Sequence, residues 1–234
     1  MASLYLIPTI LSEDALHTIP QYVHEITLRI RIFIVEDERT ARRYLRKTGY
    51  SVSFDDVTLL PLNVNTAPEE ISGYMQYFSG DTEIGLMSEA GVPAVADPGS
   101  IIVNKCHTIG TRVVPLVGPS SILLALMASG MNGQRFAFHG YIPLKNPERK
   151  NQLQAMDIAA KKGETQIFIE TPYRNNQLIQ EIISSCHGDT LLCIATDITG
   201  THEKIKTLPV SAWKKNMPQL DKTPTVFLLG TASK

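Results

Sequence analysis

The sequence has few cysteines, and they form neither a disulfide nor a metal pattern. Cys106, Cys186 and Cys193 are odd in number and lack CxxC or zinc-ligand spacing. This excludes the disulfide framework that staples small secreted domains, and it favours a reducing compartment. We therefore expect a cytoplasmic protein, and no metal site is predicted.

Long apolar runs and an excess of positive charge are also missing. No stretch approaches the ~18 continuous apolar residues that suggest a membrane span, and Met1–Pro8 has no basic residue ahead of its apolar run. We expect neither a signal peptide nor membrane contact. The formal charge of −1 excludes a broadly basic surface, so any contact with nucleic acid must come from a local patch.

Short apolar strands alternate with amphipathic helices in the first half of the chain. Strands are predicted at 4–8, 31–35, 83–87 and 113–117, and helices from Ser12, from 36–38 to Gly49, at 67–78 and at 100–109. This alternation predicts a largely parallel sheet that is covered on both faces.

A break at Gly118-Pro119-Ser120-Ser121 separates this half from the second, and we place the domain boundary there, giving domains 1–117 and 118–234. Strands lie closer together after it, at 136–142, 165–170, 191–196, 205–208 and 226–229. The fold class predicted is α/β, with two α/β domains, of which the second contains a mixed sheet with some hairpins.

The residues from Ser88 to Gly99 are rich in glycine and proline and follow the central apolar strand. Loops at the carboxyl end of a strand in an open α/β sheet form the crevice where ligands bind. Gly91 permits a close ligand approach, and Pro93 and Pro98 stiffen the backbone. The segment is therefore a ligand-binding candidate, although such a loop can also be only a turn.

Acidic residues follow several predicted strands and are candidates for proton removal or substrate orientation: Glu36, Asp37, Glu89, Asp197 and Glu203. Glu36 and Asp37 can instead be a charge cluster at a helix amino terminus. Asp197 and Glu203 can instead be exposed charges at the end of a strand. Glu170 and Arg174 have the spacing of a structural ion pair.

Basic residues gather on the helix that follows Glu38. Arg39, Arg42, Arg43, Arg46 and Lys47 share one helical face, which is suited either to RNA phosphates or to a solvated surface. A second, smaller cluster comprises Lys145, Arg149 and Lys150 in a loop where mobility would let it clamp a substrate.

The order of these motifs is similar to that of the tetrapyrrole methylase superfamily of S-adenosylmethionine-dependent methyltransferases, and within it to the ribosomal RNA small subunit methyltransferase I branch. The resemblance covers essentially the whole chain. It rests on Leu4–Thr9, Glu36-Asp37 with Arg39, Ser88–Pro93 with Asp97-Pro98-Gly99, Arg112–Leu116 with Gly118-Pro119-Ser120, Arg135-Phe136, Gly140, Pro143 with Lys145, and Glu170, Pro172 and Arg174.

The resemblance implies two α/β domains with a cofactor cleft between them, S-adenosyl-L-methionine as cofactor, a homodimer, and methyl transfer to a ribose 2′-hydroxyl of ribosomal RNA. It places around the cofactor Pro8, Ser88, Glu89, Ala90, Gly91, Ser120, Ser121, Phe168, Pro224 and Thr225. For catalysis we select Glu36, Asp37 and Asp197. For binding of the RNA substrate we select Arg39, Arg42, Arg43 and Lys145.

Three segments depart from the branch pattern. Ile10-Leu11-Ser12-Glu13 replaces Pro-Ile-Gly-Asn, Thr196–Gly200 replaces Arg-Glu-Leu-Thr-Lys, and Lys222-Thr223-Pro224 replaces a Lys-Gly-Glu turn. Because these departures remove charged side chains, two alternatives remain open. The chain can be a methylase of a tetrapyrrole or another small acceptor, or a cofactor-binding module that has lost its activity.

Overall fold

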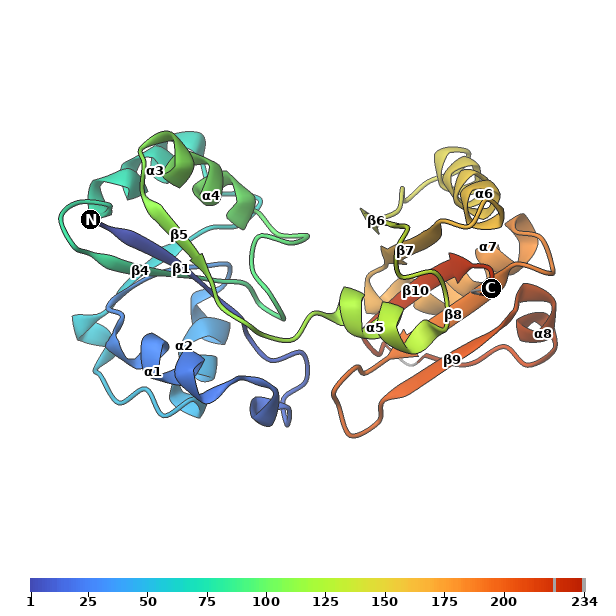
Figure 1. Cartoon of the computed structure of the whole chain (residues 1–234), viewed down its shortest axis with the longest axis horizontal. Helices are drawn as coiled ribbons and strands as arrows, with labels where there is room; N and C mark the ends of the chain where they lie inside the picture. The colour runs from blue at the N-terminus through green and yellow to red at the C-terminus, as the bar shows by residue number, and fades with distance from the viewer. Residues whose placement is uncertain (221, 233–234) are drawn as a thin grey trace. The chain divides into compact units, whose positions relative to one another are not determined.

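The structure is a computed structural model that describes residues 1–220 and 222–232. The chain divides into two compact units, unit 1 from Met1 to Ser120 and unit 2 from Ser121 to Lys234. Each unit has its own sheet, and each is described by itself (Figure 1).

Unit 1 is built on a parallel sheet with the strand order β3-β2-β4-β1-β5. Its strands are β1 (Ser3–Ile7), β2 (Ile32–Val35), β3 (Thr58–Pro61), β4 (Glu83–Met87) and β5 (Arg112–Pro115). The predicted parallel sheet is confirmed. Because β4 and β1 lie at its centre, the loops that follow them start side by side at the carboxyl edge.

Helices cover both faces of this sheet. The helical elements are η1 (Leu16–Thr18), α1 (Gln21–Arg29), α2 (Glu38–Lys47), η2 (Phe54–Asp56), α3 (Pro68–Gly73), η3 (Tyr74–Tyr77) and α4 (Gly99–Thr108). One core joins the sheet to α1 and α2, and a second joins it to α3 and α4 (Figure 1). The apolar strands are therefore buried on both sides, which is why they read as continuous apolar runs.

Two predictions for this unit are corrected. The helix expected from Ser12 begins instead at Gln21, because the residues after β1 form turns and Pro20 is the N-cap of α1. The helix expected over 67–78 is divided into α3 and η3. Strand β3 was not predicted, because it is a short edge strand that ends in proline.

Unit 2 is built on a mixed sheet with the order β6-β7-β10-β8-β9, in which only β6 and β7 pair in parallel. The strands are β6 (Phe136–Tyr141), β7 (Thr165–Ile169), β8 (Leu191–Thr196), β9 (Lys204–Pro209) and β10 (Thr225–Gly230). The predicted mixed sheet with a hairpin is confirmed.

The helical elements of unit 2 are α5 (Ser121–Ser129), α6 (Glu148–Lys161), η4 (Pro172–Arg174), α7 (Asn175–Ser185) and α8 (Val210–Lys215). Helices α6, α7 and α8 share one apolar core with the sheet, and α5 packs on β9 and β10. None of the helices in the described part of the chain is long and apolar enough to cross a membrane.

Candidate functional site

Three loops are joined at the carboxyl edge of the unit 1 sheet. The backbone N–H of Thr9, after β1, donates to the carbonyl of Gly91, after β4, at 2.9 Å. Gly118, after β5, packs on Pro8 so closely that a Cβ at this position would overlap the proline ring. Of the residues that the resemblance places around the cofactor, Pro8 and Ser88–Gly91 therefore lie together.

The loop after β4 is held in an unusual backbone conformation. Gly91 has φ +78°, and a Cβ there would lie 3.0 Å from Leu11 and 3.2 Å from the Pro119 carbonyl. Ala94 and Ala96 have φ +65° and +64°, a region that is costly for residues with a side chain. Such conformations persist where the surroundings impose them, often at ligand sites.

Asp97 imposes this conformation from within the loop. Its carboxylate accepts the Ala94 N–H at 2.9 Å and the Gly99 N–H at 2.7 Å. Burial raises the pKa of Asp97 above its ordinary value, against the opposing effect of these hydrogen bonds. Asp97 therefore holds the backbone of this loop through its side-chain hydrogen bonds.

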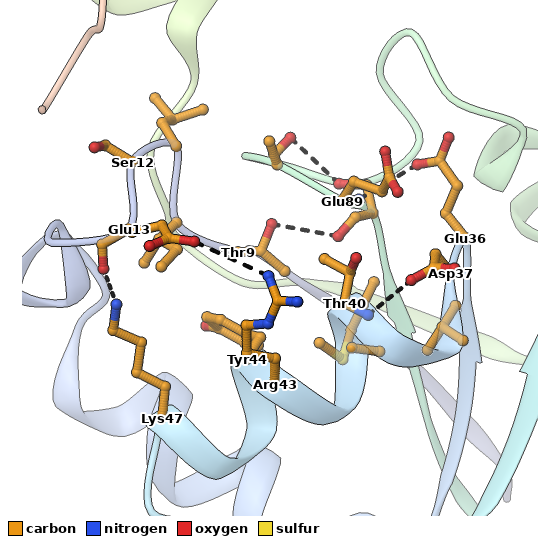
Figure 2. Close-up of a pocket in the computed structure, with 17 residues that line it drawn as sticks. Thr9, Ser12, Glu13, Glu36, Asp37, Thr40, Arg43, Tyr44, Lys47 and Glu89 are labelled. Carbon is orange, nitrogen blue, oxygen red and sulfur yellow. Dashed lines mark hydrogen bonds and ion pairs between the residues drawn. The ribbon is translucent and has the colours of Figure 1, made fainter.

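A pocket of about 290 Å³ opens beside this loop (Figure 2). Its walls come from the loops after β1, β2 and β4 and from one face of α2. Its apolar lining includes Ile10, Leu11, Val35, Ala41 and Met87, and its acidic lining is Glu13, Glu36, Asp37 and Glu89. Arg43 and Lys47 also line the pocket, so four carboxylates face two cations, and the excess of negative groups favours a ligand that carries positive charge.

Glu36 is the carboxylate best placed to exchange a proton in this pocket. It is half-buried after β2 and accepts a hydrogen bond from the Glu89 backbone N–H at 3.3 Å. Burial raises its pKa above 4.5, and the nearby charges of Glu89 and Asp97 raise it further, against that hydrogen bond. A carboxylate with a raised pKa is a stronger base than an exposed one.

Asp37 has a different role. It is the N-cap of α2, and its side chain accepts the Thr40 N–H at 2.7 Å. That hydrogen bond lowers the pKa of Asp37 below its usual value. The alternative left open by the sequence, a helix amino-terminal charge, therefore describes Asp37, although Glu36 and Asp37 both line the pocket (Figure 2).

The basic face of α2 is largely engaged within unit 1. Arg42 pairs with Glu38 at 2.9 Å, Arg43 lies 4.0 Å from the Glu13 carboxylate, and Lys47 donates to the Glu13 carbonyl. Arg46 donates to the Tyr50 carbonyl at 2.6 Å and lies over the Phe54 ring. Arg39 is exposed and forms no ion pair with the described residues.

In unit 2, each residue predicted near the cofactor lies in a different local environment. Phe168 is fully buried and stacks on Phe227 with the ring centroids 5.8 Å apart. Pro224 accepts the Asp197 N–H at 3.0 Å, and the Thr225 hydroxyl accepts from Asn175 Nδ2 at 3.1 Å. Ser121 begins α5. Phe168 thus offers no exposed surface, whereas Pro224 is exposed next to Thr225.

Asp197 organises the turn between β8 and β9. It has φ +48°, and its carboxylate accepts the His202 N–H at 2.9 Å. Glu203 accepts the Thr199 N–H at 2.8 Å in the same turn. Both carboxylates therefore stabilise the local backbone.

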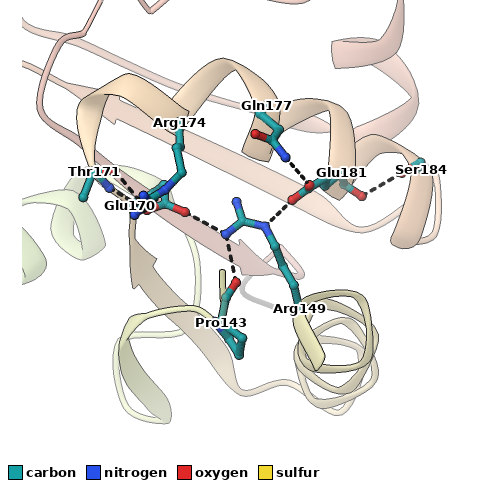
Figure 3. Close-up of polar contacts among 8 residues, drawn as sticks. All are labelled: Pro143, Arg149, Glu170, Thr171, Arg174, Gln177, Glu181 and Ser184. Atoms are coloured by element: carbon teal, nitrogen blue, oxygen red, sulfur yellow. Dashed lines mark hydrogen bonds and ion pairs between the residues drawn. The ribbon is translucent and has the colours of Figure 1, made fainter. Parts of the chain in front are cut away.

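Sequence reasoning missed a buried ion network in unit 2 (Figure 3). Glu170, which follows β7, pairs with Arg174 at 2.8 Å as expected, and also with Arg149 at 2.7 Å. Arg149 is only 2% exposed and donates as well to Glu181 and to the Pro143 carbonyl. The prediction that Arg149 belongs to a loop whose mobility lets it clamp a substrate is therefore wrong, because Arg149 lies in α6 and its side chain is buried in this network. Lys145 and Lys150 are exposed.

Among residues 1–220 and 222–232, no group of three or more histidine, cysteine, aspartate or glutamate side chains could hold a metal ion. The described cysteines are free.

No family model matches the chain. A curated protein of Vibrio cholerae serotype O1 named ribosomal RNA small subunit methyltransferase I is 30% identical over 208 residues, which cover 89% of this chain and 69% of that protein.

Two solved structures share the fold over 99% of this chain. The methyltransferase CobJ has a TM-score of 0.62 at 16% identity, with 94% of its own chain covered. Diphthine synthase has a TM-score of 0.70 at 12% identity, with 90% covered. At these identities the two likenesses show the fold alone.

Proposed function

Because the chain belongs to the ribosomal RNA small subunit methyltransferase I family, we propose that it transfers a methyl group from S-adenosylmethionine to a ribose 2′-hydroxyl of small-subunit ribosomal RNA. The observation that carries the proposal is the pocket at the carboxyl edge of β1, β2 and β4, with the half-buried Glu36 carboxylate in its wall.

The residues of unit 1 fit this cofactor. S-adenosylmethionine supplies a methyl group on a positively charged sulfonium. The carboxylates in the lining outnumber the cations Arg43 and Lys47 and complement that charge, and the apolar lining suits the uncharged parts of the molecule. The joined loops at Pro8, Ser88–Gly91 and Gly118 offer backbone groups, and Gly91 leaves the close approach that a side chain would block.

Glu36 is proposed as the proton acceptor. As the new O–CH3 bond forms and the S–CH3 bond breaks, the acceptor hydroxyl loses its proton, and the Glu36 carboxylate takes it. Burial raises its pKa, which makes the carboxylate a better base for this step. Asp37 and Asp197 support the reaction through the backbone that they hold, at the start of α2 and in the β8–β9 turn.

RNA contacts are proposed for Arg39, Arg42 and Arg43 in unit 1 and for Lys145 in unit 2. All four side chains are exposed, and positive groups are the usual partners of phosphates. The ion pairs of Arg42 and Arg43 must open or be shared for this contact, so we assign the larger contribution to Arg39 and Lys145.

A homodimer in the cytoplasm is proposed on the resemblance. Exposed apolar side chains on α5, Leu123 at 50% and Met127 at 78%, support an association surface, and the free cysteines are compatible with a reducing compartment. Light scattering after size exclusion tests the dimer: a mass twice that of the chain is expected, and the mass of one chain would reject it.

The function is tested in two steps. Calorimetric titration with S-adenosylmethionine is expected to give saturable binding. Labelled methyl transfer to isolated small ribosomal subunits is then expected to yield a 2′-O-methylated nucleoside after nuclease digestion. Binding without transfer to RNA would reject the proposal and favour a small acceptor or an inactive binding module. Absence of binding would reject the cofactor itself.

A further inference from the structure

Four lysines lie on two adjacent elements of unit 2, and the proposed function does not use them. Lys204 and Lys206 belong to β9, and Lys214 and Lys215 to the last turn of α8. All four are exposed. Strand β9 is the edge of its sheet, and α8 packs against it, as Figure 1 shows. We call these four residues the lysine surface.

The strand register places β9's lysines on the side of the sheet that carries α8. Lys206 is opposite Ile194 and Lys204 is opposite Thr196. Ile194 belongs to the core shared with α6, α7 and α8. Alternate residues of a strand point to the same face of its sheet. Lys204 and Lys206 therefore point to the face that carries α8. Because β9 is the edge strand, both side chains remain exposed.

A direct contact links the two elements. Lys206 Nζ lies 5.9 Å from the centroid of the Trp213 ring in α8. Trp213 is nearly buried and donates its Nε1–H to the Leu192 carbonyl at 2.9 Å. The indole ring is therefore held rigidly against the Lys206 side chain. Lys214 follows Trp213 directly in the sequence.

The charges of the lysine surface are not neutralised. None of the four forms an ion pair with the described residues, in contrast to Arg42 and Arg43 of α2. Unit 2 as a whole carries 13 lysines and arginines against nine aspartates and glutamates, whereas unit 1 carries nine against 14. Free positive charge is thus concentrated in unit 2, despite the net charge of −1 for the chain.

We propose that the lysine surface binds the phosphate backbone of RNA as a docking site separate from the pocket of unit 1. The proposal rests on the proposed function for the identity of the polyanion. Lysine is a compact, strongly charged donor that contacts phosphates without reading bases. Its contribution is affinity and orientation of the RNA, and methyl transfer takes place elsewhere.

The test compares matched double substitutions. Lys204→Gln/Lys206→Gln and Lys214→Gln/Lys215→Gln each remove two charges from the surface, and Arg112→Gln/Lys162→Gln removes two exposed charges elsewhere. Binding to a short single-stranded RNA and to small ribosomal subunits is measured over a range of salt concentrations. Circular dichroism and the fluorescence of Trp213, the only tryptophan, report whether each variant is folded.

Each surface variant is expected to bind RNA about tenfold more weakly at low salt. For a single strand, the slope of log affinity against log salt should become shallower by about 0.7 for each phosphate that the variant no longer neutralises. Binding of S-adenosylmethionine should stay unchanged. The control variant should bind RNA like the wild type.

Other results would overturn the proposal. If RNA affinity and its salt dependence are unchanged in both surface variants, the docking site is rejected. If aggregation is the sole effect, the lysines only protect the β9 edge from pairing with another strand. Loss of binding to anionic lipid vesicles with RNA binding retained would assign the surface to a membrane. A wild type that binds RNA through these lysines but does not methylate it would reject the proposed function and keep the docking site.

Discussion

The Glu36 carboxylate accepts a hydrogen bond from the Glu89 backbone N–H at 3.3 Å, which links the end of β2 to the loop after β4. Two acidic side chains are thereby held at one wall of the pocket. Burial of Glu36 and the nearby charge of Glu89 both disfavour the ionised form of the Glu36 carboxylate. Both effects raise its pKa.

Glu36→Gln separates activity from stability at this position. Glutamine keeps a hydrogen-bond acceptor for the Glu89 N–H but cannot take a proton, so we expect methyl transfer to fall by about 10²-fold. The melting temperature at pH 7 should not fall, because ionised Glu36 destabilises the folded state above its raised pKa. Single-turnover rates and thermal melts check both expectations, and a large drop in melting temperature would contradict them.

The activity of the wild type should decrease as the pH falls through the raised pKa of Glu36. The acceptor of the proton is the carboxylate, and protonation removes it. A pH profile of the transfer rate at saturating substrate measures this. The acidic limb should disappear in Glu36→Gln, and its persistence there would assign it to another group.

Asp37→Ala should lower the melting temperature without a comparable loss of transfer rate, because it removes the N-cap of α2. Asp37→Asn keeps a capping oxygen and serves as the control. In the wild type the pKa of Asp37 is lowered, so its contribution is present above the ordinary aspartate pKa and is lost as the pH falls through the lowered value. An inactive but fully stable Asp37→Ala variant would show a catalytic role instead.

Gly91→Ala and Gly110→Ala form a matched pair. Both glycines have positive φ, +78° and +73°, so alanine costs roughly 1–2 kcal/mol at either position. Only at Gly91 does the new Cβ approach other atoms, Leu11 and the Pro119 carbonyl. Calorimetry should show weaker S-adenosylmethionine binding for Gly91→Ala alone. Equal weakening in both variants would mean that the effect is general destabilisation.

Arg149→Met should destabilise unit 2 by about 3 kcal/mol, because it removes the buried cation between Glu170 and Glu181 and leaves Glu170 with Arg174 as its ion-pair partner. Arg135→Met is the control, since the Arg135–Glu164 pair spans 3.5 Å at the surface and an exposed pair contributes about 0–1 kcal/mol. Urea unfolding measures the difference, and similar losses in both variants would contradict it.

Acid should weaken the same network. Burial raises the pKa of Glu170, but hydrogen bonds from Arg174, Arg149 and the Thr171 N–H outweigh it and leave the pKa below 4.5. The stabilisation is therefore present above pH 4.5 and lost as the pH falls through the lowered value. The acid-unfolding midpoint should move to higher pH in Arg149→Met, and an unmoved midpoint would exclude this pair as its origin.

The sequence predicted the elements whose burial is uniform. Strand β4 has the predicted bounds, because all of Glu83–Met87 lies in the centre of a sheet covered on both faces. The family and the two-sheet α/β fold are confirmed as well. Helix α8 was missed because it has only six residues, too few to show a helical period.

The site was predicted in part, because residue type does not show which partner a side chain will meet. Glu36 and Asp37 are neighbours with similar chemistry and both line the pocket, yet only Asp37 caps α2 and only Glu36 is half-buried. Arg149 has the same residue type as the exposed arginines of α2, and only the three-dimensional fold brings it against Glu170. Such distinctions depend on contacts between residues that are distant in the sequence.

The position of β1 in its sheet determines when this strand can pair during synthesis of the chain. This first strand pairs only with β4 and β5, so Ser3 meets Glu83 and Arg112. On the ribosome, β1 has no partner until β4 has been made, while β2 can already pair with β3. Strand β1 therefore stays unpaired during most of the synthesis of unit 1, and an unpaired apolar strand is prone to aggregation.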